Sequence, residues 1–303
     1  MKTVAYLLCL LLCQLTIAQG VKLVVLGTAQ DAGAPQISCK KDCCVDLWKT
    51  GKTEAVVSLG LIDTKNQKHF LFEATPNITQ QLQTLNSVAG NGSDFGGIFL
   101  THAHMGHYSG LLFLGKEALG GQSVPVYALP KMRQYLTHNG PWEQLISEKN
   151  IALQALTAGK EEKISEEIKV TPIQVPHRDE YSETVGYLIK GPNKTALFIP
   201  DIDKWERWDT AIESLIKEVD YALLDATFFD GSELPNRDMA AIPHPFVTES
   251  LARFEPLETK EKAKIYFIHF NHTNPLLKEN SPASQEVVDK GYHIARSGLE
   301  LSL

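Results

Sequence analysis

Three histidines within six positions constrain this chain most strongly. The segment 101–107 reads Thr-His-Ala-His-Met-Gly-His and lies between an apolar strand-like run and a helix-like run. Residues two apart at a strand end point to the same side, so His102 and His104 can face one ion, while His107 on the turn into the helix reaches a neighbouring ion. The alternative is a solvated histidine-rich loop, but such tracts seldom follow a buried strand. The segment predicts a metal centre.

The length and charge of the chain narrow the function classes. A chain of 303 residues without a low-complexity linker suits one large domain, which we predict over residues 19–303. The formal net charge is -7 and the lysines are scattered, which argues against a nucleic-acid groove. We therefore expect a small-molecule substrate and no nucleic-acid partner, and the composition indicates no oligomeric state.

The first residues have the layout of a secretory signal peptide. Met1 and Lys2 precede an apolar run over 4–17, and Ala18 supplies a small residue before a cut. The run is shorter than the roughly 20 residues that span a bilayer, which disfavours the alternative of an uncleaved anchor. We predict a signal peptide over residues 1–18 and an exported protein, periplasmic or secreted, that has no membrane contact after cleavage.

The order of the expected strands and helices favours two sheets. The strands at 21–26, 55–63 and 68–73 form an antiparallel opening, with a turn at 65–67. Strands and helices then alternate, and each half of the chain is rich in strands. This pattern predicts an α/β fold, a four-layer αββα sandwich, whereas a doubly wound parallel sheet is the alternative.

Further metal-ligand candidates follow other predicted strands. His177 comes after the run 173–176, Asp201 closes the run 196–200, and His269 ends the run 265–268. Strand ends hold side chains firmly enough to bind an ion. Each residue also has an ordinary alternative: an exposed loop histidine, a helix cap, or a histidine satisfied within the core. Asp203 competes with Asp201 for the cap and for the metal.

The histidine segment resembles the first signature of the metallo-β-lactamase fold, His-x-His-x-Asp-His, except that Gly106 replaces the aspartate. The resemblance implies one or two active-site ions, zinc with manganese or iron as alternatives. It implies that Asp201 bridges them. It assigns the remaining active-site ligands as His102, His104 and His177 on the first ion and His107 and His269 on the second. The aspartate is a ligand of the second ion in that fold, so we expect Gly106→Asp to restore a missing carboxylate if the second site merely lacks a ligand. The alternative is that Gly106 makes room for substrate or for a different metal geometry.

Three cysteines of the predicted mature chain lie within six positions, at Cys39, Cys43 and Cys44. An odd number leaves either one free thiol or a single metal bound by all three. The cluster resembles the cysteine-rich loop of the phosphonate-pathway cyclic phosphodiesterase and of the coenzyme PQQ synthesis protein B family. That resemblance implies one structural zinc with His272 as fourth ligand; a disulfide from Cys39 to one of the pair is the alternative.

The resemblance to the coenzyme PQQ synthesis protein B family covers nearly the whole mature chain. It is most specific over 271–277, which reads Asn-His-Thr-Asn-Pro-Leu-Leu. Many members of that family have lost the first two histidines and lack a signal peptide, so common descent does not ensure common function.

We predict a metal-dependent hydrolase in which metal-bound hydroxide attacks a phosphodiester or other ester. Asp201 would hold the hydroxide, His244 would protonate the leaving group, and Asp225 would orient a ligand. The alternative is a protein of PQQ biosynthesis, dependent on iron or zinc and acting through an oxidative reaction. A non-catalytic binding protein fits less well with so many retained ligands.

Overall fold

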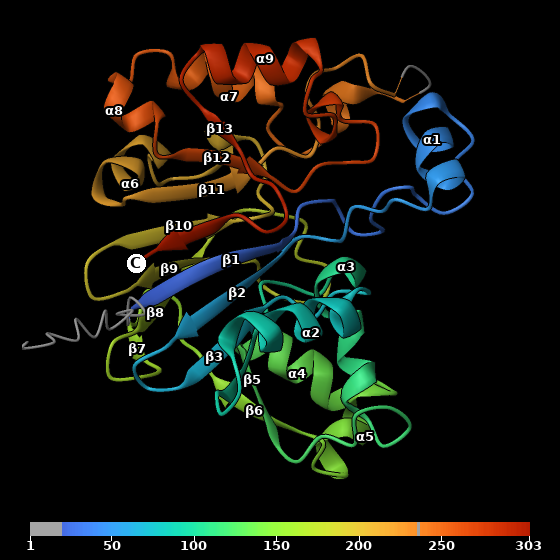
Figure 1. The fold of residues 1–303 in the computed structure, drawn as a ribbon, viewed down its shortest axis with the longest axis vertical. Coiled ribbons are helices and arrows are strands. Elements are labelled where there is room, and N and C mark those ends of the chain that lie inside the picture. Colours follow the sequence, from blue (N-terminus) through green and yellow to red (C-terminus); the bar gives the residue numbers. More distant parts are fainter. Residues whose placement is uncertain (1–19, 235–236) are drawn as a thin grey trace, which may run out of the picture.

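The computed structural model describes residues 20–234 and 237–303, so the predicted signal peptide over 1–18 lies outside the described residues. Two seven-stranded sheets pack face to face, and helices cover both outer faces (Figure 1). The predicted four-layer αββα sandwich is confirmed. Throughout residues 20–234 and 237–303, none of the helices has the length and apolar character needed to cross a membrane.

The first sheet has the strand order β14-β1-β2-β3-β4-β5-β6. Its strands are β1 (Val21–Gly27), β2 (Ser58–Asp63), β3 (Lys68–Phe72), β4 (Asp94–Phe99), β5 (Val124–Ala128), β6 (Ile151–Ala155) and β14 (Glu300–Ser302). The opening strands pair antiparallel as predicted, and β3 to β6 run parallel. The helices that cover this sheet are α2 (Ile78–Ala89), α4 (Pro130–His138) and α5 (Trp142–Ser147).

The second sheet has the strand order β13-β12-β11-β10-β9-β8-β7. Its strands are β7 (Glu162–Lys163), β8 (Lys169–Gln174), β9 (Val185–Lys190), β10 (Thr195–Ile199), β11 (Tyr221–Asp225), β12 (Ile265–Ile268) and β13 (His293–Ile294). Strands β10 to β13 run parallel, so their carboxyl ends meet at one edge. The helices on its outer side are α6 (Ile212–Glu218), α7 (Val247–Phe254), α8 (Thr259–Lys262) and α9 (Pro282–Asp289).

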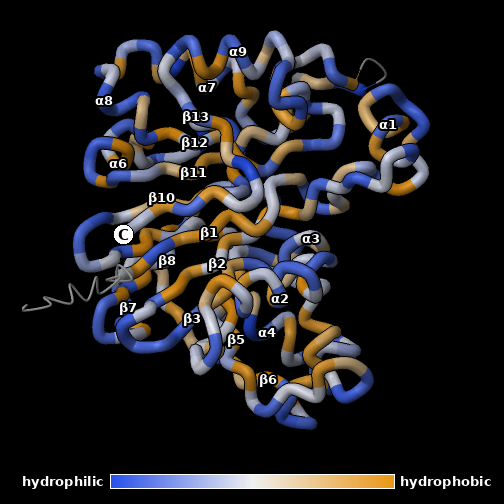
Figure 2. Tube along the Cα trace, in the orientation of Figure 1, coloured by the Kyte–Doolittle hydropathy of each residue, from blue (hydrophilic) through white to orange (hydrophobic). Residues whose placement is uncertain are grey.

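Large apolar side chains fill the space between the two sheets. The ring of Phe72 from β3 lies 4.9 Å from that of Phe99 and 6.3 Å from that of Phe198 in the opposite sheet, measured between centroids. Tyr187 from β9 joins the same cluster and donates a hydrogen bond to the carbonyl oxygen of Leu100. In Figure 2 the strands at the centre of the molecule are coloured largely as hydrophobic. This packed core fixes the positions of the strands, and therefore of the side chains at their carboxyl ends.

The helix-like run that follows the histidine segment does not form one continuous helix. The structure has a short helix α3 (Met105–Tyr108) followed by a 3-10 helix, η1 (Ser109–Leu114). A Cβ on Gly110 would lie 2.1 Å from the carbonyl oxygen of Thr75, so the chain passes too close to that loop for a regular exposed helix. The other 3-10 helices among the described residues are η2 (Trp205–Arg207), η3 (Met239–Ala241) and η4 (Pro275–Leu277).

Candidate metal centre

The candidate ligands of the first ion come together at the carboxyl ends of the strands. His102 and His104 follow β4, His177 follows β8, and Asp201 follows β10. One ligand atom from each of these four residues lies within 4.8 Å of the others, a spacing that allows one ion to touch all four. Strands of two different sheets thus supply one site.

Asp201 lies between two groups of imidazoles. Its Oδ2 is 3.0 Å from His107 Nε2 and 3.3 Å from His269 Nε2, while its Oδ1 is 3.6 Å from His177 Nε2. This is the position that a bridging carboxylate requires. Asp203, the competing candidate, instead contacts Nδ1 of His177 at 3.2 Å.

Buried nitrogen atoms without hydrogen-bond partners converge on Asp201. Leaving a buried polar atom unpaired costs free energy unless a cation binds there. Burial also lowers the pKa of His102 well below its usual value, which favours the neutral imidazole that binds metals. The residues present therefore fit a divalent ion. The unpartnered nitrogens are Nε2 of His102, His107, His177 and His269.

In His102, His177 and His269 the opposite ring nitrogen is held by a neighbouring side chain. Such contacts fix the orientation of a metal-binding imidazole. His104 is reversed, since its Nε2 lies 3.1 Å from Glu180 Oε2, which leaves Nδ1 as the nitrogen available to an ion. The contacts to Nδ1 of the others are Thr101 with His102 at 2.9 Å, Asp203 with His177 at 3.2 Å, and Thr227 with His269 at 2.9 Å.

Two acidic residues in the centre were not predicted from the sequence. Glu73 is fully buried after β3, and its Oε1 lies 3.5 Å from His107 Nδ1. Asp31, in the loop after β1, places Oδ1 3.4 Å from His107 Nε2. Against the cost of burial, these carboxylates and Asp201 raise the pKa of His107 well above its ordinary value. Glu73 had a local signal, since it is a lone acid ending the apolar run Phe-Leu-Phe.

Glu73 and His269 also share an unusual backbone conformation. Their φ angles are +74° and +69°, in the left-handed region that non-glycine residues seldom adopt. Such strain persists only where the surrounding structure holds the residue in place, and it gathers at functional sites. Both residues turn sharply out of a strand at the metal centre.

His244 contacts the metal centre through Asp201 and Asp225. Its Nδ1 lies 2.8 Å from Asp225 Oδ2 and 3.3 Å from Asp201 Oδ1. Burial disfavours the charged ring, but the carboxylates of Asp225 and Asp201 outweigh burial and raise the pKa of His244 to about 9. Asp225 also accepts a hydrogen bond from Thr227 Oγ1 at 2.7 Å, and its Oδ1 lies 3.8 Å from His269 Nδ1. These carboxylates therefore favour the protonated form of His244.

A cavity of about 350 Å³ lies beside His244. Arg178 and Arg237 line it together with His244, and Phe228 and Ile242 contribute an apolar wall. Guanidinium groups bind phosphate and carboxylate oxygens through paired hydrogen bonds. The cavity therefore suits a molecule with an anionic group and an apolar part.

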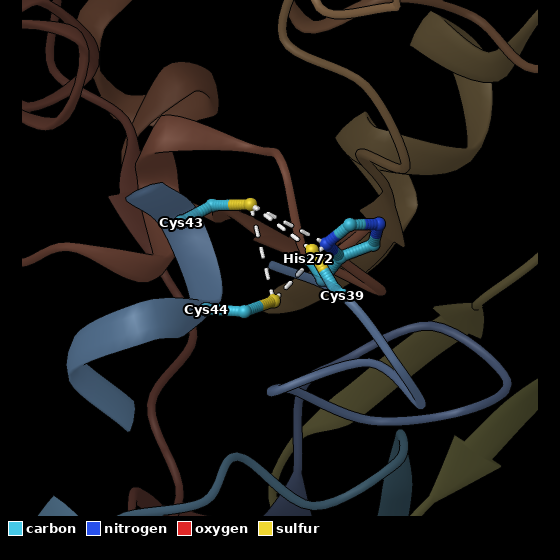
Figure 3. A group of neighbouring side chains, drawn as sticks. All are labelled: Cys39, Cys43, Cys44 and His272. Carbon is cyan, nitrogen blue, oxygen red and sulfur yellow. Dashed lines mark hydrogen bonds between the residues drawn. The ribbon is translucent and has the colours of Figure 1, made fainter. Parts of the chain in front are cut away.

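The three cysteines and His272 form a second cluster, shown in Figure 3. Cys43 and Cys44 lie on α1 (Asp42–Thr50), a helix that the sequence analysis did not predict. The Sγ atom of Cys43 is 3.9 Å from each of the other two sulfurs, and His272 Nδ1 is 3.5 Å from Cys43 Sγ and 3.3 Å from Cys44 Sγ.

These separations fit a tetrahedral zinc. With Zn–S near 2.3 Å and Zn–N near 2.0–2.1 Å, ligand atoms are about 3.8 Å apart for two sulfurs and about 3.5 Å for sulfur and nitrogen. A disulfide needs sulfurs about 2.05 Å apart, and all three cysteines are free thiols in this structure. Burial and the neighbouring thiols raise the pKa of Cys43 to about 12, so a thiolate there requires a cation.

Comparison with known proteins agrees with this architecture. The chain is 25% identical over 312 residues to coenzyme PQQ synthesis protein B of Methylorubrum extorquens, covering 92% of this chain and 99% of that protein. The same protein of Ruegeria pomeroyi is 26% identical over 314 residues, covering 93% of this chain and 100% of the relative.

Two solved structures have the same fold. Zinc-bound PqqB from Methylobacterium extorquens superimposes with a TM-score of 0.76 at 23% identity, covering 93% of this chain and 100% of that one. A diphosphatase from the PhnP family superimposes with a TM-score of 0.66 at 22% identity, covering 93% and 98%. Residues 68–270 match the model of the beta-lactamase superfamily domain. The chain therefore belongs to the beta-lactamase superfamily.

Proposed function

We propose that this protein is an exported, metal-dependent hydrolase of phosphate esters. The observation that carries the proposal is the convergence of unpartnered imidazole nitrogens around Asp201, beside a cavity lined by Arg178 and Arg237. The diphosphatase of similar fold supports a substrate that is attacked at a phosphoryl group. The signal-peptide pattern over 1–18 supports export to the periplasm or the medium.

The metal ligands, the two arginines and His244 have different roles in the proposed reaction. When bound, a divalent ion lowers the pKa of coordinated water to about 7 and stabilises charge on the attacked oxygen. Arg178 and Arg237 hold the anionic group of the substrate, and the buried carboxylate of Asp201 orients the attacking water. His244, protonated below pH 9, gives its proton to the leaving oxygen. We expect zinc in the active site, as one or two ions, and one zinc at the cysteines.

Metal analysis and hydrolysis measured together test this proposal. Wild-type protein should hydrolyse bis(p-nitrophenyl) phosphate, and His104→Ala should lose both that activity and one tightly bound ion. Full metal content with an unchanged rate in His104→Ala would refute the site assignment. The control is His138→Ala, an exposed histidine on α4.

Export has its own measurement. Mass spectrometry of protein recovered from the periplasm or medium should show an amino terminus at Gln19. Recovery of the intact chain from the cytoplasm alone would contradict this part of the proposal.

A role in PQQ biosynthesis is the second candidate. The 25% identity to coenzyme PQQ synthesis protein B along nearly the whole of both chains favours it. A histidine and carboxylate set also suits iron and oxygen chemistry. Here the active ion would be iron or zinc and the reaction oxidative. Phosphate-ester hydrolysis that is equal with and without oxygen supports the hydrolase, whereas oxygen-dependent turnover without hydrolysis supports the second candidate.

A further inference from the structure

The second ion lacks the aspartate of the superfamily motif, because Gly106 stands in its place. We propose that Asp31, from the loop after β1, supplies the missing carboxylate ligand of the second ion, together with His107 and His269. This inference rests on the proposed metal centre and deepens it. The carboxylate comes from a different part of the chain but reaches the same ion.

The space beside Gly106 is already filled by Asp31. A Cβ on Gly106 would lie 2.4 Å from both Cα and Oδ1 of Asp31 and 3.0 Å from its Cβ. Contacts this short involve backbone, so a side chain at position 106 forces the loop to move. The side chain of Gly106→Asp would therefore collide with Asp31, and on this proposal the glycine leaves room for a carboxylate that arrives from elsewhere.

The reactive atom of Asp31 is placed as a ligand. Its Oδ1 is buried, has no hydrogen-bond partner and lies 3.4 Å from His107 Nε2. A nitrogen of His269 also lies within 4.8 Å of this oxygen and of the His107 nitrogen. Nε2 of each histidine is unpartnered as well, so three buried candidate ligand atoms lie close to one another. A cation would satisfy all three.

The loop that carries Asp31 is fastened to the strand end that carries His269. Gln30 N donates to Phe270 O at 2.8 Å, and Phe270 N donates to Thr28 O at 2.8 Å. Asn271 Nδ2 donates to the side chain of Gln30 at 2.6 Å. Two ligands far apart in sequence are thus held by one short backbone ladder, which gives Asp31 the rigidity that a metal ligand needs.

Zinc titration of the metal-stripped full chain tests this assignment. Asp31→Asn keeps the shape of the side chain but removes its charge, so the second active-site ion should bind roughly 100-fold more weakly. Mutation of a residue that only hydrogen-bonds to a metal ligand already lowers metal affinity about 10–100-fold. Zinc content after gel filtration should fall by about one ion per chain. Asp209→Asn, the same change on the exposed surface, is the control and should match wild type.

Gly106→Ala gives an independent test, because it removes no ligand. Its methyl group should displace Asp31 and weaken the same ion, while binding of the other ions stays unchanged. A folded Gly106→Ala protein, or Asp31→Asn, that binds the second ion as wild type does would overturn the proposal. Wild-type protein with a single active-site ion would also overturn it. If the variants lose zinc as expected but the wild-type protein hydrolyses no phosphate ester, the proposed function is refuted and the assignment of Asp31 stands.

Discussion

At the scale of single residues, the sequence predicts those parts of the centre that follow local spacing. The positions of His102, His104 and His107 could be predicted because alternation along one strand end brings them together. Asp31 could not be predicted, and Glu73 offered only the weak signal of an acid that ends an apolar run, because a lone acid beside a strand can have many roles. Their contribution becomes visible only when three-dimensional packing places them on His107.

His244 yields a prediction about the leaving group. We expect His244→Gln to lower kcat about 10²–10⁴-fold for phosphodiesters with poor alkoxide leaving groups, because these need a proton from His244. Esters of p-nitrophenol should be much less affected, since that oxygen leaves without protonation. In wild type the rate for alkyl esters should decline as pH rises through about 9, where His244 loses its proton.

Steady-state kinetics over a pH series checks this prediction, with zinc content measured on the same samples. An equal loss for both kinds of ester, or a metal content below that of wild type, would show that His244 holds the site together and does not donate a proton.

At the scale of elements, His69 connects strand β3 to helix α2 and to the residues just before β4. Its Nδ1 lies 2.8 Å from Ser93 Oγ in front of β4, and its Nε2 lies 2.9 Å from Asn86 Oδ1 in α2. Burial lowers the pKa of His69 below its ordinary value near 6.5. The folded chain therefore keeps this ring neutral under conditions in which the unfolded chain protonates it.

The sign of the resulting pH dependence follows from linkage. As pH falls below about 6.5, the unfolded state binds a proton that the folded state does not, so the free energy of unfolding decreases until the pH passes the lowered pKa. We expect His69→Gln to reduce this decrease. Urea unfolding of both proteins at several pH values, with saturating zinc, checks it, and identical pH slopes would contradict the assignment.

The same scale shows where helix prediction succeeds and fails. Helix α9 (Pro282–Asp289) carries its own start signal, a Ser281 cap followed by proline, so its beginning can be located from the sequence alone. Helix α1 (Asp42–Thr50) was missed because Cys44 is its one buried residue and the helix lies at the periphery of the molecule (Figure 1). Its position depends on the contacts of its cysteines with His272, which no local pattern encodes.

At the scale of the whole molecule, the two sheets depend on the aromatic cluster around Phe72. This ring contacts Phe99 in its own sheet and Tyr187 and Phe198 in the other. Phe72→Ala should lower the free energy of unfolding by about 3–5 kcal/mol, because the cavity lies where neither sheet can collapse into it. Denaturant unfolding measures the loss, and a change below about 1 kcal/mol would show that the sheets repack.

The cysteine cluster brings residues 39–44 next to His272, and a bound zinc should stabilise this contact between distant parts of the chain. We expect His272→Ala to lose one zinc and to lower the Tm, while the active-site ions remain. Thiol titration of unreduced, metal-stripped wild type should find three thiols per mature chain. One thiol would instead indicate a disulfide and leave His272 without a metal.

The pairing of β1 with β14 determines when this molecule can finish folding. Lys22 lies opposite Ser302 and Val24 opposite Glu300, and Leu303 N donates to Val21 O. Strand β1 is thus synthesised long before its partner β14, and its edge stays exposed until residues 300–303 arrive. A ribosome-bound chain that lacks residues 300–303 cannot complete its first sheet, so chaperone binding to the nascent protein should persist until those residues have left the ribosome.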